Sequence, residues 1–348
     1  MQRCKHTQWL SLSTDGAEST LLESDKLQRL VKHIPDPDHQ EPSLLVLIGN
    51  KSKAIALKES FGFKRYRGFR ARRSAGEIHL HLDSRSAFGV RPLLVADSDL
   101  PDQNFQTKFA EQRCHNVKKR PLTGESALNV VAKDLFINLL YYFTDVFCFF
   151  SDDVGGLRVV AQEVAAWLER AHDSPIQIIR PSIAIIVNNV STGSRSERET
   201  KRIFLQLLKA ETLKDLSQRI SDIHIISLFA EGTVSTDTRY RYLRERIVAY
   251  SDHVRKERRD NRSLFSSTHF VALFNYACAT FRSSTKLNFI EASRQDNLVA
   301  VDLEEHLSSL LNQIHSSSVL MDFFIPTVAS SFLLDSYPPD SHSKLKFH

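Results

Sequence analysis

Cysteine is scarce in this sequence and is never paired at short spacing. The four cysteines lie far apart and form no Cys-x-x-Cys, which argues against a structural zinc site. Cys148 lies within an apolar run, as expected for a buried, reduced thiol in an intracellular compartment. Cys114 precedes His115, but no second pair of metal-ligating residues matches these two, so we interpret them as structural.

Long hydrophobic runs are also missing. The longest apolar stretch, residues 143–150, is too short and too interrupted to cross a bilayer, and the polar first residues do not resemble a signal peptide. We therefore expect a cytoplasmic protein without a membrane span. The composition, 42% hydrophobic and 25% charged over 348 residues, is typical of a soluble globular protein that needs no metal or disulfide to hold its core.

The charge balance gives no strong sign of nucleic-acid binding. The net charge is only +5, and basic residues are concentrated in two short stretches, 64–73 and 255–259. Basic residues interleaved with aromatic ones can bind the phosphates of nucleic acid or lipid. A solvated, flexible face explains both stretches more simply.

Two hydrolytic motifs are absent. The sequence has no Gly-x-Ser-x-Gly, the nucleophile turn of serine hydrolases. Its 14 histidines include no His-x-x-x-His pair with a glutamate base on a helix. Nucleophilic or zinc-dependent hydrolysis is therefore not expected.

Between residues 43 and 235, short apolar runs alternate with helix-like segments. Buried strands are predicted at 44–48, 92–96, 145–150, 182–187 and 222–228. A strictly alternating segment, 77–82, is predicted to be an edge strand, and 101–124 a polar loop. Helices are predicted at 54–61, 126–140, 157–170 and 196–210. This order predicts a doubly wound, mostly parallel α/β sheet of the P-loop NTPase, GTPase-like type, with ligand sites beyond the carboxyl ends of its strands.

The flanking regions lack this alternation. Residues 1–42 are predicted to be a polar leader with one short helix at 25–33. The strand signal ends near residue 236, so residues 236–337 are predicted to form an all-α domain, followed by a polar tail over 338–348. Pro326 is expected to kink the last helix of that domain.

The loop after the first predicted strand is where a triphosphate would bind. Gly49 is correctly placed for a phosphate-binding loop, G-x-x-x-x-G-K-[ST]. The second glycine, the lysine and the hydroxyl of that pattern fall on Ala54, Ile55 and Ala56, so all three are missing.

A shorter loop would bring other donors to a phosphate. Asn50, Lys51, Ser52 and Lys53 are the residues that could then contact it. Together with Gly49 they form a degenerate nucleotide-binding loop in our interpretation, for GTP or ATP with Mg²⁺. A plain strand-to-helix turn is an equally good alternative.

Polar residues also follow the other strands. Asp97 and Asp152 are the candidate ligands for Mg²⁺, although strand-terminal aspartates are also common helix N-caps. Asn188 lies where GTPases carry the base-reading Asn-Lys-x-Asp and is a candidate nucleotide contact. Ser191 replaces the aspartate that would hold guanine, so guanine specificity is not supported.

Four segments, 47–54, 91–99, 143–156 and 333–339, resemble the amino-terminal region of large fungal patatin-like phospholipases of the FabD/lysophospholipase-like type. The resemblance implies a divergent GTPase-type domain that precedes a patatin domain. It also implies an accessory region, compatible with a truncated or split product. A patatin domain uses a Gly-x-Ser-x-Gly serine and an Asp-Gly aspartate, which this chain lacks in that context, so the resemblance transfers no phospholipase activity.

Three functions follow as hypotheses. The first is a degenerate nucleotide-binding, pseudo-GTPase-like regulatory or accessory module that associates with a patatin-type phospholipase. The second is a structural or protein-interaction scaffold without a ligand. The third is an active nucleoside triphosphatase with a nonstandard loop. The nucleotide hypotheses require Gly49, Asp97, Asp152 and Asn188 to lie at one edge of a common sheet, and the missing lysine argues against catalysis.

Overall fold

The computed structural model describes the chain in nine stretches. They are residues 6–15, 18–63, 77–99, 115–123, 128–171, 180–188, 196–261, 263–282 and 302–335. The chain divides into two compact units, Met1–Thr285 and Lys286–His348.

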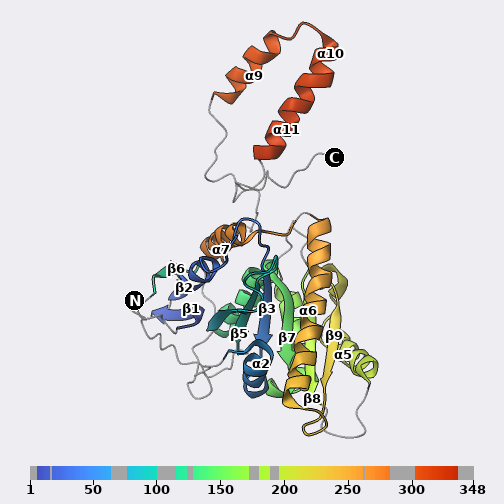
Figure 1. Cartoon of the computed structure of the whole chain (residues 1–348). Helices are drawn as coiled ribbons and strands as arrows, with labels where there is room; N and C mark the ends of the chain where they lie inside the picture. Colours follow the sequence, from blue (N-terminus) through green and yellow to red (C-terminus); the bar gives the residue numbers. More distant parts are fainter. Residues whose placement is uncertain are drawn as a thin grey trace. The chain divides into compact units, whose positions relative to one another are not determined.

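A mixed sheet forms the centre of the first unit, with the strand order β6-β2-β1-β4-β5-β3-β7-β8-β9 (Figure 1). The strands are β1 (Gln8–Asp15), β2 (Glu18–Ser24), β3 (Ser43–Ile48), β4 (Ile78–Leu82), β5 (Leu93–Ser98), β6 (Val117–Pro121), β7 (Thr144–Phe150), β8 (Ser182–Asn188) and β9 (Ile223–Leu228). The five strands β5, β3, β7, β8 and β9 are parallel. The other four join by antiparallel pairing.

Helices cover both faces of the parallel part. One face packs against α2 (Lys51–Phe61) and α6 (Thr236–Asp260), which bury Leu57 and Leu243 against alternate residues of β7 such as Cys148. The intervening residues of β7, Phe147 and Phe149, contact Trp167 of α4 (Leu157–Arg170) on the opposite face. Burial on both faces is why these strands are continuous apolar runs in the sequence.

The remaining helices of the first unit flank this arrangement. They are α1 (Lys26–Val31), α3 (Leu128–Asp134), η2 (Leu135–Leu139), η3 (Leu140–Tyr142), η4 (Ser151–Asp153), α5 (Glu197–Glu211), η5 (Leu216–Gln218) and α7 (Ser267–Thr280). The second unit contains α9 (Leu303–Asn312), α10 (Ser317–Val319), η6 (Leu320–Phe324) and α11 (Ile325–Asp335).

The prediction of a loose polar leader over residues 1–42 is wrong. β1 and β2 form an antiparallel hairpin within the sheet, and Trp9, Leu10 and Leu21 are completely buried. Part of the predicted polar loop over 101–124 is also a strand, because β6 pairs with β2. These strands were missed because serine, threonine, lysine and glutamate dilute their apolar pattern.

Because β1, β2 and β6 extend the sheet, the prediction that residues 77–82 form an edge strand is also wrong. The strand β4 lies between β1 and β5, so it is an interior strand and not an edge. Its alternation is real, since Ile78 and Leu80 are fully buried while His79 and His81 are partly exposed. Alternation shows that one face is less covered than the other, but it does not tell which strands lie alongside.

The predicted domain boundary at residue 236 also differs from the structure. Helix α6 packs on the sheet through Tyr240, Leu243 and Ile247, and α6 and α7 both belong to the first unit. The basic stretch 255–259 is not a solvated face throughout, because Arg255 and Arg258 are buried. The other basic stretch, 64–73, lies outside the described residues.

In the second unit, the described residues form helices and the short connection 313–316 between α9 and α10. Pro326 is the second residue of α11, immediately after the π-helical turn η6. Across the described parts of the chain, no helix combines the length and the hydrophobicity that crossing a bilayer requires.

Candidate functional site

The candidate residues from four strands lie at the same edge of the sheet. Gly49 follows β3, Asp97 is near the end of β5, Asp152 follows β7 and Asn188 ends β8. These strands are parallel neighbours in the order β5-β3-β7-β8. Their carboxyl ends therefore meet at one edge, which is where α/β sheets bind ligands.

The N-terminus of α2 lies at this edge, where the sequence predicted a phosphate, and a carboxylate of the chain itself occupies it. Asp153 Oδ2 accepts hydrogen bonds from the backbone N–H groups of Asn50 (2.7 Å) and Lys53 (3.0 Å), and its Oδ1 accepts one from Ser52 (3.0 Å). The first N–H groups of a helix have no partner within the helix and carry its positive dipole end. Asp153 satisfies the donors that a phosphate would otherwise use.

The connection from β3 to α2 is short and tightly enclosed. Only Gly49 and Asn50 separate Ile48 from Lys51, the first residue of α2. A Cβ atom built on Gly49 would lie 2.9 Å from both Asp153 Oδ2 and Phe150 Cβ. The connection is therefore as short as the alternative phosphate loop in the sequence analysis. However, the end of β7 and the turn that follows it fill the space beside Gly49.

The side chain of Lys53 is buried against the end of β5. Its ammonium group lies 2.7 Å from Asp97 Oδ1 and 2.5 Å from Asp99 Oδ1, and it donates a 2.7 Å hydrogen bond to the carbonyl of Ser98. Lys53 is 1% exposed and Asp97 is completely buried. The predicted phosphate ligand and a predicted metal ligand are therefore ion-pair partners. Lys51 and Ser52 differ from Lys53, since Lys51 is exposed and Ser52 half-buried.

Asp152 and Asn188 also bind each other. Asn188 Nδ2 donates to Asp152 Oδ2 at 2.7 Å, and Asn188 Oδ1 accepts from Arg239 Nη2 at 2.8 Å. Arg239, at the start of α6, is 3.4 Å from the exposed Glu231. Both functional ends of the Asn188 amide are engaged in contacts with the protein.

Both aspartates come from a single turn, residues 151–156, which follows β7. Ser151 Oγ donates to the carbonyl of Ile186 in β8 (2.9 Å), and the N–H of Gly156 donates to the carbonyl of Ser151 (2.7 Å). Gly155 and Gly156 have φ values of 99° and 95°, which favour glycine. The turn directs Asp153 toward α2 and Asp152 toward Asn188.

Sequence reasoning missed the role of Asp153. In the sequence it directly follows Asp152, the predicted metal ligand, and nothing there distinguishes the two. Asn50 is a favoured N-cap residue, and only the structure shows that its side chain does not cap α2. A helix start that lacks a local cap requires a partner from elsewhere in the chain.

The arrangement does not fit GTP or ATP with Mg²⁺. The phosphate donors are bound to Asp153, Lys53 is bound to Asp97, and Asn188 is bound to Asp152. In the described part of the chain, no group of three or more His, Cys, Asp or Glu side chains is placed to hold a metal ion. Strand β3 separates the strands that carry Asp97 and Asp152, the two predicted Mg²⁺ ligands.

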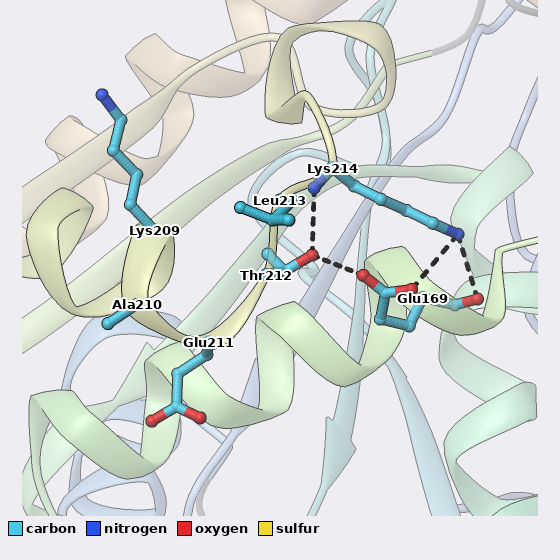
Figure 2. Close-up of a pocket in the computed structure, with 7 residues that line it drawn as sticks. All are labelled: Glu169, Lys209, Ala210, Glu211, Thr212, Leu213 and Lys214. Atoms are coloured by element: carbon cyan, nitrogen blue, oxygen red, sulfur yellow. Dashed lines mark hydrogen bonds and ion pairs between the residues drawn. The ribbon is translucent and has the colours of Figure 1, made fainter.

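A surface hollow occurs elsewhere, at the C-terminal ends of α4 and α5 (Figure 2). These helices run back from the carboxyl edge of the sheet, so their ends lie toward the opposite edge. In the hollow, Thr212 Oγ1 donates to Glu169 at 2.5 Å, and Lys214 Nζ donates to the carbonyls of Leu168 and Glu169 at 3.1 Å. Lys214 thus caps α4, and these contacts are those of a helix end.

No family model and no curated protein matches the sequence. Among solved structures, the chain is similar to Toc33 from Arabidopsis thaliana, a dimerization-deficient mutant. The identity is 13%, the match covers 65% of this chain and 91% of that one, and the TM-score is 0.34. It is also similar to a probable GTP-binding protein, EngB, with 12% identity, coverage of 61% and 100%, and a TM-score of 0.30. At these values neither structure supports a statement about function.

Proposed function

We propose that this chain is a pseudo-GTPase, a GTPase-like module whose nucleotide-binding edge is filled by its own side chains. It acts as a regulatory or accessory protein that binds other proteins. The observation that carries the proposal is the position of Asp153 on the N–H groups of Asn50, Ser52 and Lys53.

The strand order supports the GTPase-like part of the proposal. In the part of the sheet from β4 to β9, the strands lie in the order β4-β5-β3-β7-β8-β9. Numbered by their order in the chain, with β3 as the first, this order is 2-3-1-4-5-6, and the second strand, β4, is antiparallel. This is the arrangement of GTPase-type domains. In that arrangement the β3–α2 connection would correspond to the phosphate position and Asn188 to the base position, which supports the proposal.

Electrostatics supports the absence of a bound nucleotide. Four carboxylates, those of Asp97, Asp99, Asp152 and Asp153, lie at or near this edge. Lys53 forms ion pairs with Asp97 and Asp99, whereas Arg239 donates to Asn188, which in turn donates to Asp152. A triphosphate would have to displace Asp153, at a cost of about 1–3 kcal/mol for the lost hydrogen bonds, and enter a region of like charge.

Nucleotide titration of the full chain tests the proposal. We expect no saturable binding of fluorescent GTP or ATP at millimolar concentration, with or without Mg²⁺. The variant Asp153→Ala should gain weak binding of inorganic pyrophosphate, because it frees the three N–H donors and removes one negative charge. The matched control Asp152→Ala should not, since Asp153 stays in place. Micromolar binding of either nucleotide to the unmodified chain would contradict the proposal.

Association with a patatin-type phospholipase is part of the proposal only through the sequence resemblance. A purified patatin-type phospholipase is therefore the first partner to test, by co-elution of the mixed proteins in size-exclusion chromatography. An active triphosphatase that uses Lys53 and Asp97 is not proposed, because these residues are buried against each other.

A further inference from the structure

The helices of the second unit expose apolar side chains that a soluble helix normally covers. None of the residues 302–331 is buried. In α9, Leu303, Leu307, Leu310 and Leu311 follow one helical stripe, and the last two are each 45% exposed. In the segment from α10 to α11, Met321 is 62% exposed and Phe323 is 74% exposed.

The α10–α11 segment is apolar on more than one face. Val319, Met321, Phe323 and Ile325 are all exposed, although their spacing of two residues places them around the helix and not along one stripe. A helix that is apolar on all sides is stable in water only when its surface is covered. Exposed apolar surface of this kind marks an interaction site.

The charges of this unit indicate what covers it. Residues 302–331 contain four acidic residues, Asp302, Glu304, Glu305 and Asp322, and no lysine or arginine. Asp322 lies within the apolar segment, between Met321 and Phe323. The surface is therefore apolar and acidic together, and the complementary occupant is apolar and basic.

We propose that α9 and the α10–α11 segment bind a basic amphipathic helix of a partner protein, with apolar residues on one face and lysine or arginine beside them. A second copy of this chain fits less well, because it would bring four acids against four acids. An anionic membrane surface is disfavoured for the same reason, since interfacial helices carry basic residues on their polar face.

The experiment compares two labelled helical peptides of the same leucine pattern, one with lysine and one with glutamate at the polar positions. Their binding to the full chain is measured by fluorescence anisotropy. We expect the lysine peptide to bind at least about tenfold more tightly, and its affinity to fall as NaCl is raised. Equal binding of the two peptides, or no binding of either, would overturn the proposal.

Charge-reversed variants separate this site from the rest of the surface. The variant Glu304→Lys/Glu305→Lys/Asp322→Lys should lose the preference for the lysine peptide. The control Glu199→Lys/Glu211→Lys/Asp237→Lys reverses three exposed acids of α5 and α6 and should retain it. Loss of the preference in the control as well would mean that only net charge matters, which would also overturn the proposal.

A second pair of variants tests the apolar part. Phe323→Ser should weaken binding of the lysine peptide about tenfold or more, whereas Phe88→Ser, at a similarly exposed phenylalanine of the first unit, should not. Circular dichroism checks that both variants retain their helices. Two results would assign the surface to another occupant: a dimer that Phe323→Ser dissociates, or binding to phosphatidylcholine–phosphatidylserine vesicles that Phe323→Ser abolishes.

Discussion

The ammonium group of Lys53 lies 2.7 Å from the carboxylate of Asp97, and both side chains are withdrawn from water. The pair joins the first turn of α2 to the end of β5, at the carboxyl edge of the parallel strands. Removing one partner of such a pair leaves an uncompensated buried charge, which costs far more than the pair itself contributes.

The first prediction concerns this pair. We expect Lys53→Met to lower the free energy of unfolding by about 3–5 kcal/mol, because Asp97 would remain buried without its cation. Urea denaturation measures the change. The double variant Lys53→Met/Asp97→Leu should recover part of the loss. Lys58→Met, at an exposed pair with Glu59, serves as the control and should change stability by about 1 kcal/mol or less.

The second prediction concerns the space at Gly49. Gly49→Ala places a Cβ atom 2.9 Å from Phe150 Cβ and Asp153 Oδ2, and should destabilise the chain by about 1–3 kcal/mol. Gly89→Ala is the control, because its nearest atom outside the adjoining residues would be 3.5 Å away, an ordinary contact. Thermal unfolding compares the two. Equal melting temperatures would show that the 151–156 turn can move aside without cost.

The third prediction concerns Arg258, a buried residue in the last turn of α6. It forms an ion pair with Asp145 at 3.0 Å and donates to the carbonyls of Tyr142 and Thr144. Arg258→Met should cost about 3–5 kcal/mol, because Asp145 is also buried. The neighbouring Arg259, which is 64% exposed, should tolerate the same change within about 1 kcal/mol. Chemical denaturation measures the stability of both variants. A similar loss of stability in the two would show that burial of the guanidinium group is unimportant.

The fourth prediction concerns pH and His224. Burial lowers the pKa of this histidine to about 4, and its ring stacks on Tyr250 with a centroid distance of 3.6 Å. The unfolded chain, with the ordinary histidine pKa near 6.5, binds the proton more readily than the folded chain between these two values. The contribution of His224 to stability is therefore constant above about pH 6.5 and decreases as the pH falls toward 4.

Comparison with His224→Phe isolates this effect. Between pH 7 and pH 4 the unmodified chain should lose about 2 kcal/mol more stability than the variant, which is less than the full shift implies because the ring is partly solvated. Parallel stability curves for the unmodified chain and His224→Phe would rule out the effect.

The elements that the sequence predicted best are those with a clear apolar pattern. The strand at 145–150 corresponds to β7, because burial on both faces leaves a continuous apolar run. The helix at 157–170 corresponds to α4, because its one buried face leaves apolar residues at helical spacing. The strands β1, β2 and β6 were missed for the opposite reason. They are strands because they pair with their neighbours in the sheet, and their amino-acid composition does not indicate this pairing.

The pattern of apolar runs is enough to predict the alternation of strands and helices, and with it the edge at which Gly49, Asp97, Asp152 and Asn188 come together. The residues after Gly49 also show that the phosphate-loop pattern is incomplete. The folded chain was needed to show that Asp153 occupies the N-terminus of α2 and that Lys53 pairs with Asp97. Both contacts join residues distant in the chain, and their geometry depends on how the 151–156 turn directs two adjacent aspartates, which no local pattern encodes.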